Sequence, residues 1–193
     1  MKVENKTMLV YAVTDRTWLK GQILEEQVEQ AIKGGATFIQ LREKELDYDA
    51  FLEQAIKIKK ITDKYHVPFV INDNVEIALA VNADGVHVGQ KDMEAGEVRK
   101  KLGENKIIGV SVQTIEQALL AQKHGADYLG VGAVFSTSTK LDASEVSFET
   151  LQQICKAVSI PVVAIGGISA KNVLQLKKSG IDGIAVVSAI FAQ

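Results

Sequence analysis

Short apolar segments alternate with amphipathic segments along the whole sequence. In the amphipathic segments the apolar residues recur at positions i, i+3 and i+4, which is typical of helices that bury one face. This alternation predicts βαβ units around a parallel sheet. The apolar segments predict eight strands, which centre on Leu9–Val13, Thr37–Leu41, Phe69–Ile71, Gly85–Val88, Ile107–Val110, Tyr128–Val131, Val162–Ile165 and Gly183–Val187. The predicted helices between the strands include Leu24–Lys33, Tyr48–Tyr65, Ile115–Lys123 and Lys171–Lys178.

A recurring helix ending precedes four of the predicted strands. The segments are Gly34-Gly35-Ala36, Asn82-Ala83-Asp84, Gly125-Ala126-Asp127 and Gly180-Ile181-Asp182, and Gly or Asn is favoured where a helix ends in the left-handed conformation. Many α/β folds end helices in this way, so the repeat by itself leaves open both a closed barrel and an open doubly wound sheet. The strand count favours the barrel, and Val13-Thr14-Asp15-Arg16 lacks the glycine-rich turn of a dinucleotide-binding sheet. We predict a single α/β domain over residues 1–193, a (β/α)8 TIM barrel.

The helix that follows the eighth strand is short in this prediction. The residues after that strand are Ala189-Ile190-Phe191-Ala192-Gln193, whereas a barrel strand is normally covered by a full helix. An uncovered strand would expose a larger apolar patch than monomers tolerate. We therefore expect either a homo-oligomer or coverage of this flank by the amino-terminal segment.

The composition narrows the classes of partner. Hydrophobic residues make up 47% and charged residues 24% of the sequence, as in ordinary folded domains. A net charge of −2 gives no overall field that would attract nucleic acid or an anionic membrane, so we expect neither partner and favour small-molecule substrates. The first residues lack the apolar core of a signal peptide, and no apolar stretch reaches the roughly 20 residues that span a bilayer. We expect a cytoplasmic location.

Charged and amide side chains follow the second strand. Barrels of this kind carry their functional residues at the carboxyl ends of the strands, where the second strand continues as Gln40-Leu41-Arg42-Glu43-Lys44. In extended backbone, successive side chains alternate, so Gln40, Arg42 and Lys44 would share one side and could face a bound anion. Considered alone, such a run of charges is more commonly a solvated loop.

Two carboxylates end neighbouring strands. Asp73 follows Asn72 after the third strand, and Asp92 follows the fourth. Asn72 and Asp73 also fit a turn and a helix N-cap. Carboxylates on adjacent strand ends can nevertheless share Mg²⁺, which takes one or two carboxylates together with substrate phosphate oxygens. Asp73 and Asp92 are therefore predicted Mg²⁺ ligands, whereas His87, inside the fourth strand, fits a hydrogen-bonded lining residue better than a ligand.

Two further regions fit phosphate. After the sixth strand, Thr137-Ser138-Thr139-Lys140 places hydroxyl groups beside a lysine, which suits phosphate oxygens, although a plain Ser/Thr loop also fits. Gly166-Gly167 and Val187-Ser188 follow the seventh and eighth strands, where such barrels have a recurrent phosphate site. Two anion sites without an evident nucleophile and base indicate substitution at carbon, with pyrophosphate as the leaving group.

Eight segments together resemble one enzyme family. They are Tyr11-Ala12-Val13-Thr14-Asp15, Gln40–Lys44, Asn72-Asp73, Ala83–Gln90 with Asp92, Gly109-Val110-Ser111, Thr137–Lys140, Ile165–Ile168 and Val187–Ile190. Each segment alone is unspecific, but the combination, from Tyr11 to Ile190, is similar to the thiamine phosphate synthases. Enzymes of that family join a pyrimidine pyrophosphate to a thiazole phosphate.

The resemblance implies roles for individual residues. The residues implied to contact the pyrimidine pyrophosphate are Gln40, Arg42, Lys44, Asn72, Ser111 and Lys140. The residues implied to contact the thiazole phosphate are Thr137, Thr139, Gly167, Val187 and Ser188. Mg²⁺ on Asp73 and Asp92 would act with the catalytic residues Arg42, Lys44, Ser111 and Lys140. The resemblance also implies that pyrophosphate leaves first and that the thiazole nitrogen then captures the pyrimidinyl methylene cation.

Two other functions remain open from the sequence. The related thiazole tautomerases use a histidine in the sixth-strand segment, and Gly132-Ala133-Val134-Phe135 contains none. A non-catalytic barrel that binds thiamine phosphate or a precursor would belong to a different functional class. A turnover assay with both substrates and Mg²⁺ would distinguish these functions from a synthase.

Overall fold

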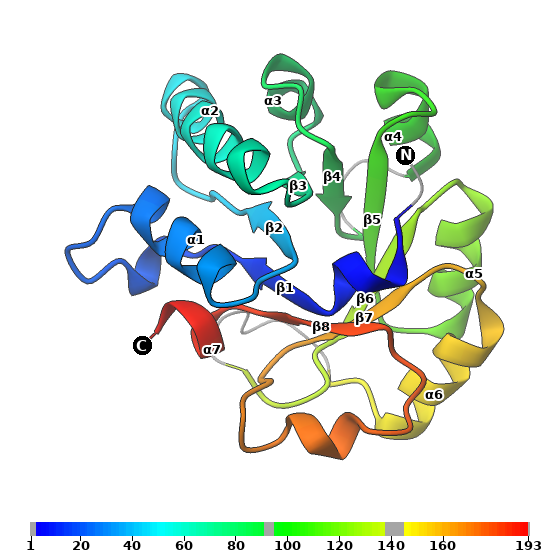
Figure 1. Ribbon diagram of the computed structural model, residues 1–193. Coiled ribbons are helices and arrows are strands. Elements are labelled where there is room, and N and C mark those ends of the chain that lie inside the picture. Colours follow the sequence, from blue (N-terminus) through cyan, green and yellow to red (C-terminus); the bar gives the residue numbers. More distant parts are fainter. Residues whose placement is uncertain (1–2, 91–94, 138–144, 193) are drawn as a thin grey trace.

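The computed structural model describes residues 3–90, 95–137 and 145–192. Within these ranges, eight parallel strands close into a barrel in which each strand pairs with the next and β8 pairs with β1 (Figure 1). The strands are β1 (Val10–Val13), β2 (Phe38–Leu41), β3 (Phe69–Asn72), β4 (Gly85–Val88), β5 (Ile107–Val112), β6 (Tyr128–Gly132), β7 (Val162–Ile165) and β8 (Gly183–Val186). The predicted (β/α)8 barrel is confirmed, and each predicted strand overlaps an observed one.

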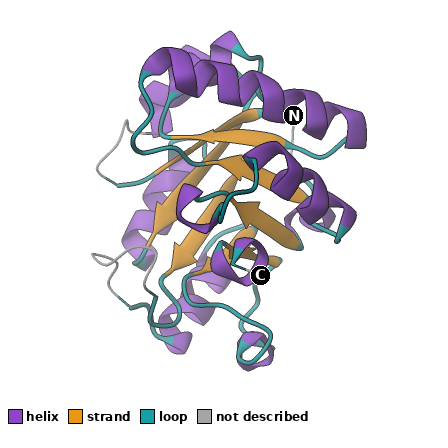
Figure 2. Cartoon of the chain, turned by 90° about the vertical axis from the view of Figure 1, so that its left-hand side faces the viewer, coloured by secondary structure: helices purple, strands orange, loops and turns teal. Residues whose placement is uncertain are grey.

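Helices lie outside the strands in both ribbon views (Figure 1, Figure 2). The α-helices are α1 (Leu24–Lys33), α2 (Tyr48–Tyr65), α3 (Val75–Ala80), α4 (Ala95–Leu102), α5 (Ile115–Lys123), α6 (Phe148–Ala157) and α7 (Ser188–Phe191). The 3-10 helices are η1 (Asn5–Met8), η2 (Arg16–Trp18) and η3 (Val173–Leu176). Within the described ranges, none of these helices combines the length and apolar character that a membrane span requires.

The predicted helix Lys171–Lys178 is wrong. A single short 3-10 helix, η3, occupies the middle of this segment. Asn172, which would lie in the first turn, instead uses its side chain to bind the carbonyl of Gly167 and the backbone N–H of Ser169. Lys178 adopts a left-handed φ of 74°, which stops a helix at the other end. The segment therefore has room for little more than one helical turn.

Two apolar layers hold the barrel together. The outer layer lies between the strands and the surrounding helices. The inner layer fills the barrel itself and consists of Met8, Tyr11, Val13, Phe38, Val70, Ile107, Tyr128, Val163 and Ala185. Because Met8 precedes β1, its fully buried side chain closes the amino-terminal end of the barrel interior.

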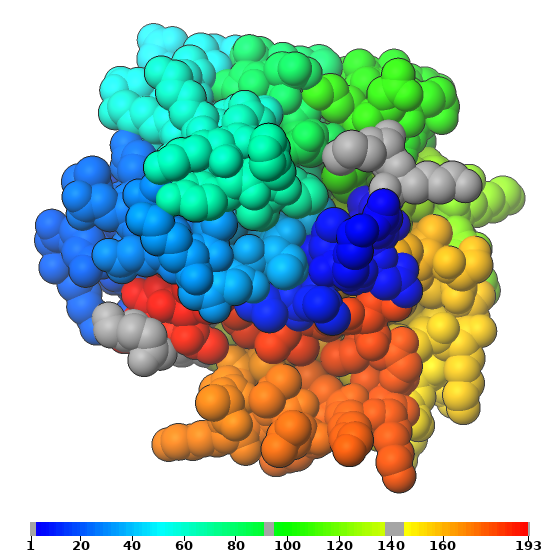
Figure 3. Space-filling view, in the orientation of Figure 1, coloured from blue at the N-terminus to red at the C-terminus, as the bar shows by residue number. Residues whose placement is uncertain are grey.

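The amino-terminal segment reaches the start of β8. Asn5 donates a hydrogen bond of 2.5 Å to Asp182, just before that strand, and Figure 3 shows the blue amino-terminal residues against red-orange residues from near the other end. Ile184, within β8, nevertheless stays partly exposed. Coverage by the amino-terminal segment is thus partial, and the expected homo-oligomer stays a prediction.

The four recurring helix endings also tie neighbouring strands together. Gly35, Asn82, Gly125 and Gly180 have positive φ, as the sequence predicted. The residue that precedes each even-numbered strand then accepts a hydrogen bond from a backbone N–H at the start of the strand before it. These bonds join Thr37 to Val10 (3.0 Å), Asp84 to Phe69 (2.9 Å), Asp127 to Ile108 (2.8 Å) and Asp182 to Val162 (2.8 Å). The same type of side-chain-to-backbone hydrogen bond therefore joins the two strands of each pair of βα units.

We expect Gly85→Ala to destabilise the barrel by about 3 kcal/mol or more. A Cβ atom at Gly85 would lie 1.9 Å from the carbonyl oxygen of Ile107, so β4 and β5 would have to move apart. Gly96→Ala in α4 is the matched control, because its Cβ would come no closer than 4.0 Å to another group, and alanine in a helix should stabilise by up to about 1 kcal/mol. Urea unfolding measures both. Equal stability of the two variants would contradict the close approach of β4 and β5.

Candidate active site

A cavity of about 430 Å³ opens at the carboxyl ends of the strands. It is lined by all the predicted site residues that the structure describes, which are Gln40, Arg42, Lys44, Asn72, Asp73, Ser111, Thr137, Gly167, Val187 and Ser188. Three other predicted site residues, Asp92, Thr139 and Lys140, lie outside the described residues. A smaller hollow of about 220 Å³, between α6 and η3, is mainly apolar and contains none of the predicted residues. The cavity thus brings the described residues together, while their binding roles stay predictions.

Successive side chains at the end of β2 point alternately into the cavity and away from it, as the sequence predicts. Gln40, Arg42 and Lys44 line the cavity. Leu41 packs in the outer apolar layer, and the carboxylate of Glu43 is turned towards Arg16. The solvated-loop alternative is therefore wrong for Gln40, which is 4% exposed. An amide and two cations from one strand end face the same space.

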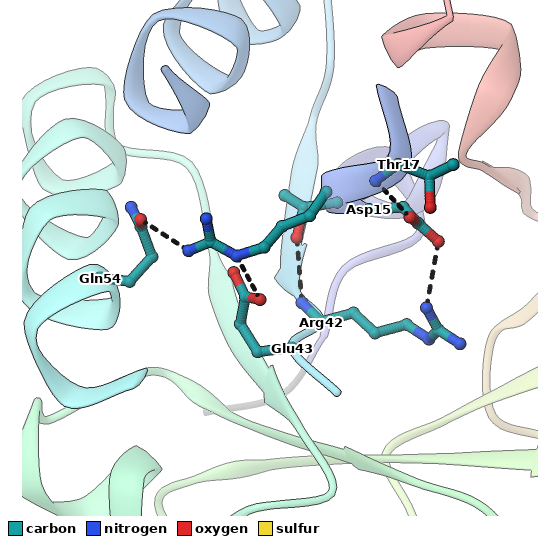
Figure 4. Close-up of polar contacts among 7 residues, drawn as sticks. Asp15, Thr17, Arg42, Glu43 and Gln54 are labelled. Atoms are coloured by element: carbon teal, nitrogen blue, oxygen red, sulfur yellow. Dashed lines mark hydrogen bonds and ion pairs between the residues drawn. The ribbon is translucent and has the colours of Figure 1, made fainter. Parts of the chain in front are cut away.

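Two reciprocal ion pairs join the loops after β1 and β2 (Figure 4). Arg16 donates to Glu43 at 2.7 Å, and Arg42 donates to Asp15 at 3.2 Å. The backbone N–H of Arg42 also donates to the Thr14 hydroxyl at 3.0 Å. Burial raises the pKa of Glu43, while the Arg16 hydrogen bond opposes that shift. Arg42 is therefore held at the cavity wall by partners that the sequence analysis did not assign.

Asp73 lies at the cavity mouth with an exposed carboxylate. Its backbone is left-handed, with φ of 61°, and its N–H donates to the carbonyl of His87 at 2.8 Å. The amide of Asn72 donates to Asp73 Oδ2 at 2.6 Å. The N-cap of α3 is Asn74, which accepts a hydrogen bond from the Ile77 N–H. The alternative that Asn72 and Asp73 serve as the helix cap is wrong, because Asn74 performs that function.

Close backbone packing shapes the wall formed by the loops after β6 and β7. Val134 N–H donates to the carbonyl of Ile165, and Phe135 N–H donates to that of Gly166. A Cβ atom at Gly167 would lie 2.3 Å from the carbonyl oxygen of Ser136, so glycine permits this approach. As a result the β6 loop, which carries Thr137, lies directly against Gly167.

Backbone N–H groups are available at the β7 and β8 ends of the cavity. Among the hydrogen bonds within the described residues, none uses the backbone N–H of Gly167 or Ser188 as a donor. Asn172, which sequence reasoning missed, holds the Gly167 carbonyl at 2.8 Å and so fixes the peptide next to this position. Unpaired N–H groups on a fixed loop are the donors that a phosphate group requires.

Buried polar side chains lie beneath the cavity. His87 is 7% exposed and bonds to the hydroxyl groups of Tyr128 and Ser111, at 2.9 and 2.8 Å. The prediction of a hydrogen-bonded lining histidine is confirmed. Burial raises the pKa of Tyr11 and Tyr128, so both phenols remain protonated. Both tyrosines were missed as polar residues because each occurs in an apolar strand pattern.

Similarity to known proteins covers nearly the whole chain. The chain is 60% identical over 184 residues to the thiamine-phosphate synthase of Ruminiclostridium cellulolyticum, and the aligned region covers 95% of this chain and 88% of that protein. The chain is also 56% identical over 193 residues to the thiamine-phosphate synthase of Clostridium tetani, and this alignment covers 100% of this chain and 92% of that protein. Among solved structures, thiamine phosphate pyrophosphorylase from Pyrococcus furiosus matches with a TM-score of 0.90 and 41% identity, over 98% of this chain and 90% of that one.

A family-level comparison gives the same result. The profile described as thiamine monophosphate synthase matches residues 10–190, a range that includes all eight strands and every residue proposed for the site. The chain therefore belongs to the thiamine monophosphate synthase family.

Proposed function

We propose that the chain condenses 4-amino-2-methyl-5-hydroxymethylpyrimidine pyrophosphate with 4-methyl-5-(2-hydroxyethyl)thiazole phosphate, or its carboxylated form. The products are thiamine phosphate and pyrophosphate, and the carboxylated form would also release its carboxyl group as carbon dioxide. The observation that carries this proposal is that one cavity is lined by two groups of residues whose chemistry suits anions. Arg42 and Lys44 belong to the first, and Gly167 and Ser188 belong to the second. Two such groups would allow one cavity to bind two phosphorylated substrates at once.

The side chains support a dissociative substitution. The bond between the pyrimidine methylene carbon and the pyrophosphate oxygen breaks first, and its electron pair leaves with the pyrophosphate. Arg42 and Lys44 stabilise the negative charge that grows on that group, which is where fixed cations contribute most. The thiazole nitrogen then donates its lone pair to the methylene cation. No protein nucleophile is needed, because the thiazole supplies the attacking atom.

We propose Mg²⁺ as the metal that accompanies the pyrophosphate. The described residues contain no cluster of three or more His, Cys, Asp or Glu side chains, so they do not form a cage made of protein ligands alone. Asp73 nevertheless fits Mg²⁺, which prefers one or two carboxylates plus phosphate oxygens and water. Bound Mg²⁺ would neutralise charge on the leaving pyrophosphate. Asp92 is the second proposed ligand.

Turnover with both substrates tests the proposed function. With Mg²⁺ present, the wild-type protein should release one pyrophosphate for each thiamine phosphate, and omission of either substrate should abolish formation of thiamine phosphate. A thiazole tautomerase would instead convert a thiazole phosphate without the pyrimidine substrate. A non-catalytic binder would give no product at any enzyme concentration. Either of these two results would refute the proposal.

A further inference from the structure

Five polar side chains form a continuous hydrogen-bond relay across the barrel interior. It begins with Gln40 on β2, whose amide nitrogen lies 2.5 Å from the Tyr11 hydroxyl on β1. The Tyr11 hydroxyl lies 2.7 Å from that of Tyr128 on β6, which lies 2.9 Å from His87 Nδ1 on β4. His87 Nε2 lies 2.8 Å from the Ser111 hydroxyl on β5. Gln40 and Ser111, the two ends of the relay, both line the cavity.

The hydrogen-bond partners favour one direction of donation along the relay. The Gln40 amide nitrogen is a donor, so the Tyr11 oxygen accepts from it. A buried hydroxyl hydrogen needs an acceptor, and among the described residues the Tyr128 oxygen is the one that Tyr11 contacts. Tyr128 then donates to His87 Nδ1, which leaves the ring hydrogen on Nε2. That hydrogen is donated to the Ser111 oxygen. Ser111 is thereby left to donate its hydroxyl hydrogen into the cavity.

A glycine provides the space for the relay. A Cβ atom at Gly109 would lie 2.1 Å from the Tyr128 ring and 2.5 Å from His87 Nδ1. Gly109 and Ser111 are two positions apart on β5 and therefore point to the same face of the strand. The segment Gly109-Val110-Ser111 thus supplies both the gap in which Tyr128 meets His87 and the hydroxyl group that His87 contacts.

We propose that Tyr128 and His87 are positioning residues that fix Ser111 as a hydrogen-bond donor to the pyrimidine substrate. The proposal rests on the proposed function for the identity of that substrate. An aminopyrimidine offers ring nitrogens with lone pairs, which are suitable acceptors for a hydroxyl donor. Tyr128 is fully buried and is not part of the cavity wall, and the hydrogen bonds that connect it to Ser111 run through His87.

The hydrogen position on His87 tests the relay without any substrate. Nitrogen-15 spectra of ligand-free protein labelled at histidine distinguish a hydrogen on Nε2 from one on Nδ1. His66 and His124 lie at the ends of α2 and α5, and comparison with His87→Gln assigns the His87 signals. We expect the hydrogen on Nε2. A hydrogen on Nδ1 would overturn the proposal, whether or not the protein is a synthase.

Binding of the pyrimidine pyrophosphate with Mg²⁺, measured by calorimetry without the thiazole, tests the effect on Ser111. Tyr128→Phe keeps the ring but removes the hydroxyl, so His87 can take either tautomer. We expect affinity to fall about two- to tenfold, the worth of one hydrogen bond, with the KM for thiazole phosphate unchanged. Tyr65→Phe, which removes a hydroxyl bonded to Glu29 on the outer surface, is the matched control and should bind normally.

A double-mutant cycle separates positioning from general support of the fold. In a Ser111→Ala protein the relay has no hydroxyl to orient, so adding Tyr128→Phe should cause no further loss of affinity. An additive loss, or an equal loss for both substrates, would mean that Tyr128 only supports the barrel and would overturn the proposal. Failure of the proposed function is recognised separately, as absence of turnover by the wild-type protein.

Discussion

Replacement of Asp73 by asparagine should lower turnover by about two orders of magnitude or more while the barrel stays folded. The carboxylate lies at the mouth of the cavity beside Asn72 and is the described residue proposed to bind Mg²⁺. Asparagine is a better test than alanine, because it tolerates the left-handed φ of 61° at this position. Asp73→Ala should lose as much activity but combines the missing ligand with backbone strain.

Initial rates at saturating substrates, with urea unfolding of each variant, measure this effect. Glu53→Gln on α2 is a suitable control, because it also removes a carboxylate, one that pairs with Lys57 on the exposed surface. The same assay tests the metal directly, since excess chelator should abolish turnover and added Mg²⁺ or Mn²⁺ should restore it. Full activity in excess chelator would be incompatible with the proposed metal site.

Local periodicity explains why so much of the site was predictable. Side chains alternate along a strand, so Gln40, Arg42 and Lys44 could be placed on one side from the sequence alone. The ends of parallel strands meet at one face of a barrel, so Asp73, Ser111 and Ser188 follow from strand assignment. Predictions of this kind need no knowledge of which distant residues touch.

Long-range polar contacts could not be predicted in this way. Tyr11 and Tyr128 are 117 positions apart, and each occurs in an apolar strand pattern that predicts core packing. The pairing of Asp15 with Arg42 depends equally on how two loops meet. The Lys171–Lys178 helix failed because of a shorter-range contact, in which Asn172 binds Gly167, five positions earlier and outside the predicted helix. In each of these cases the observed contact or conformation depends on a residue outside the sequence pattern from which the prediction was made.

The ion pair between Asp15 and Arg42 has a consequence for the proposed pyrophosphate site. It keeps the guanidinium at the cavity wall through one of its nitrogens, at 3.2 Å, with the arginine side chain 15% exposed. Arginine has five N–H donors, so this contact leaves donors for a phosphate oxygen. Arg42 is therefore oriented before substrate binds, and less side-chain entropy is lost when the complex forms.

Ser188→Asp and Arg42→Ala should affect different substrates, because the model of two anion sites assigns them to different phosphates. Aspartate at position 188 would replace a donor by a negative charge opposite the thiazole phosphate. Loss of one charge-assisted hydrogen bond is worth roughly 1.5–3 kcal/mol, or about ten- to a hundredfold in affinity, and repulsion adds to it. Arg42→Ala should instead weaken the pyrimidine pyrophosphate or slow its departure, with little effect on the thiazole phosphate.

Initial rates measured while each substrate is varied against saturating amounts of the other give the two apparent KM values for each variant. Ser188→Ala separates loss of the hydroxyl from addition of the charge and should show a smaller thiazole defect than Ser188→Asp. Arg42→Lys keeps a positive charge but loses the planar donor geometry that also binds Asp15, so it should recover only part of the activity. The two-site assignment would be wrong if Ser188→Asp raised the KM only for the pyrimidine pyrophosphate. It would also be wrong if Ser188→Asp and Arg42→Ala, both correctly folded, impaired the two substrates equally.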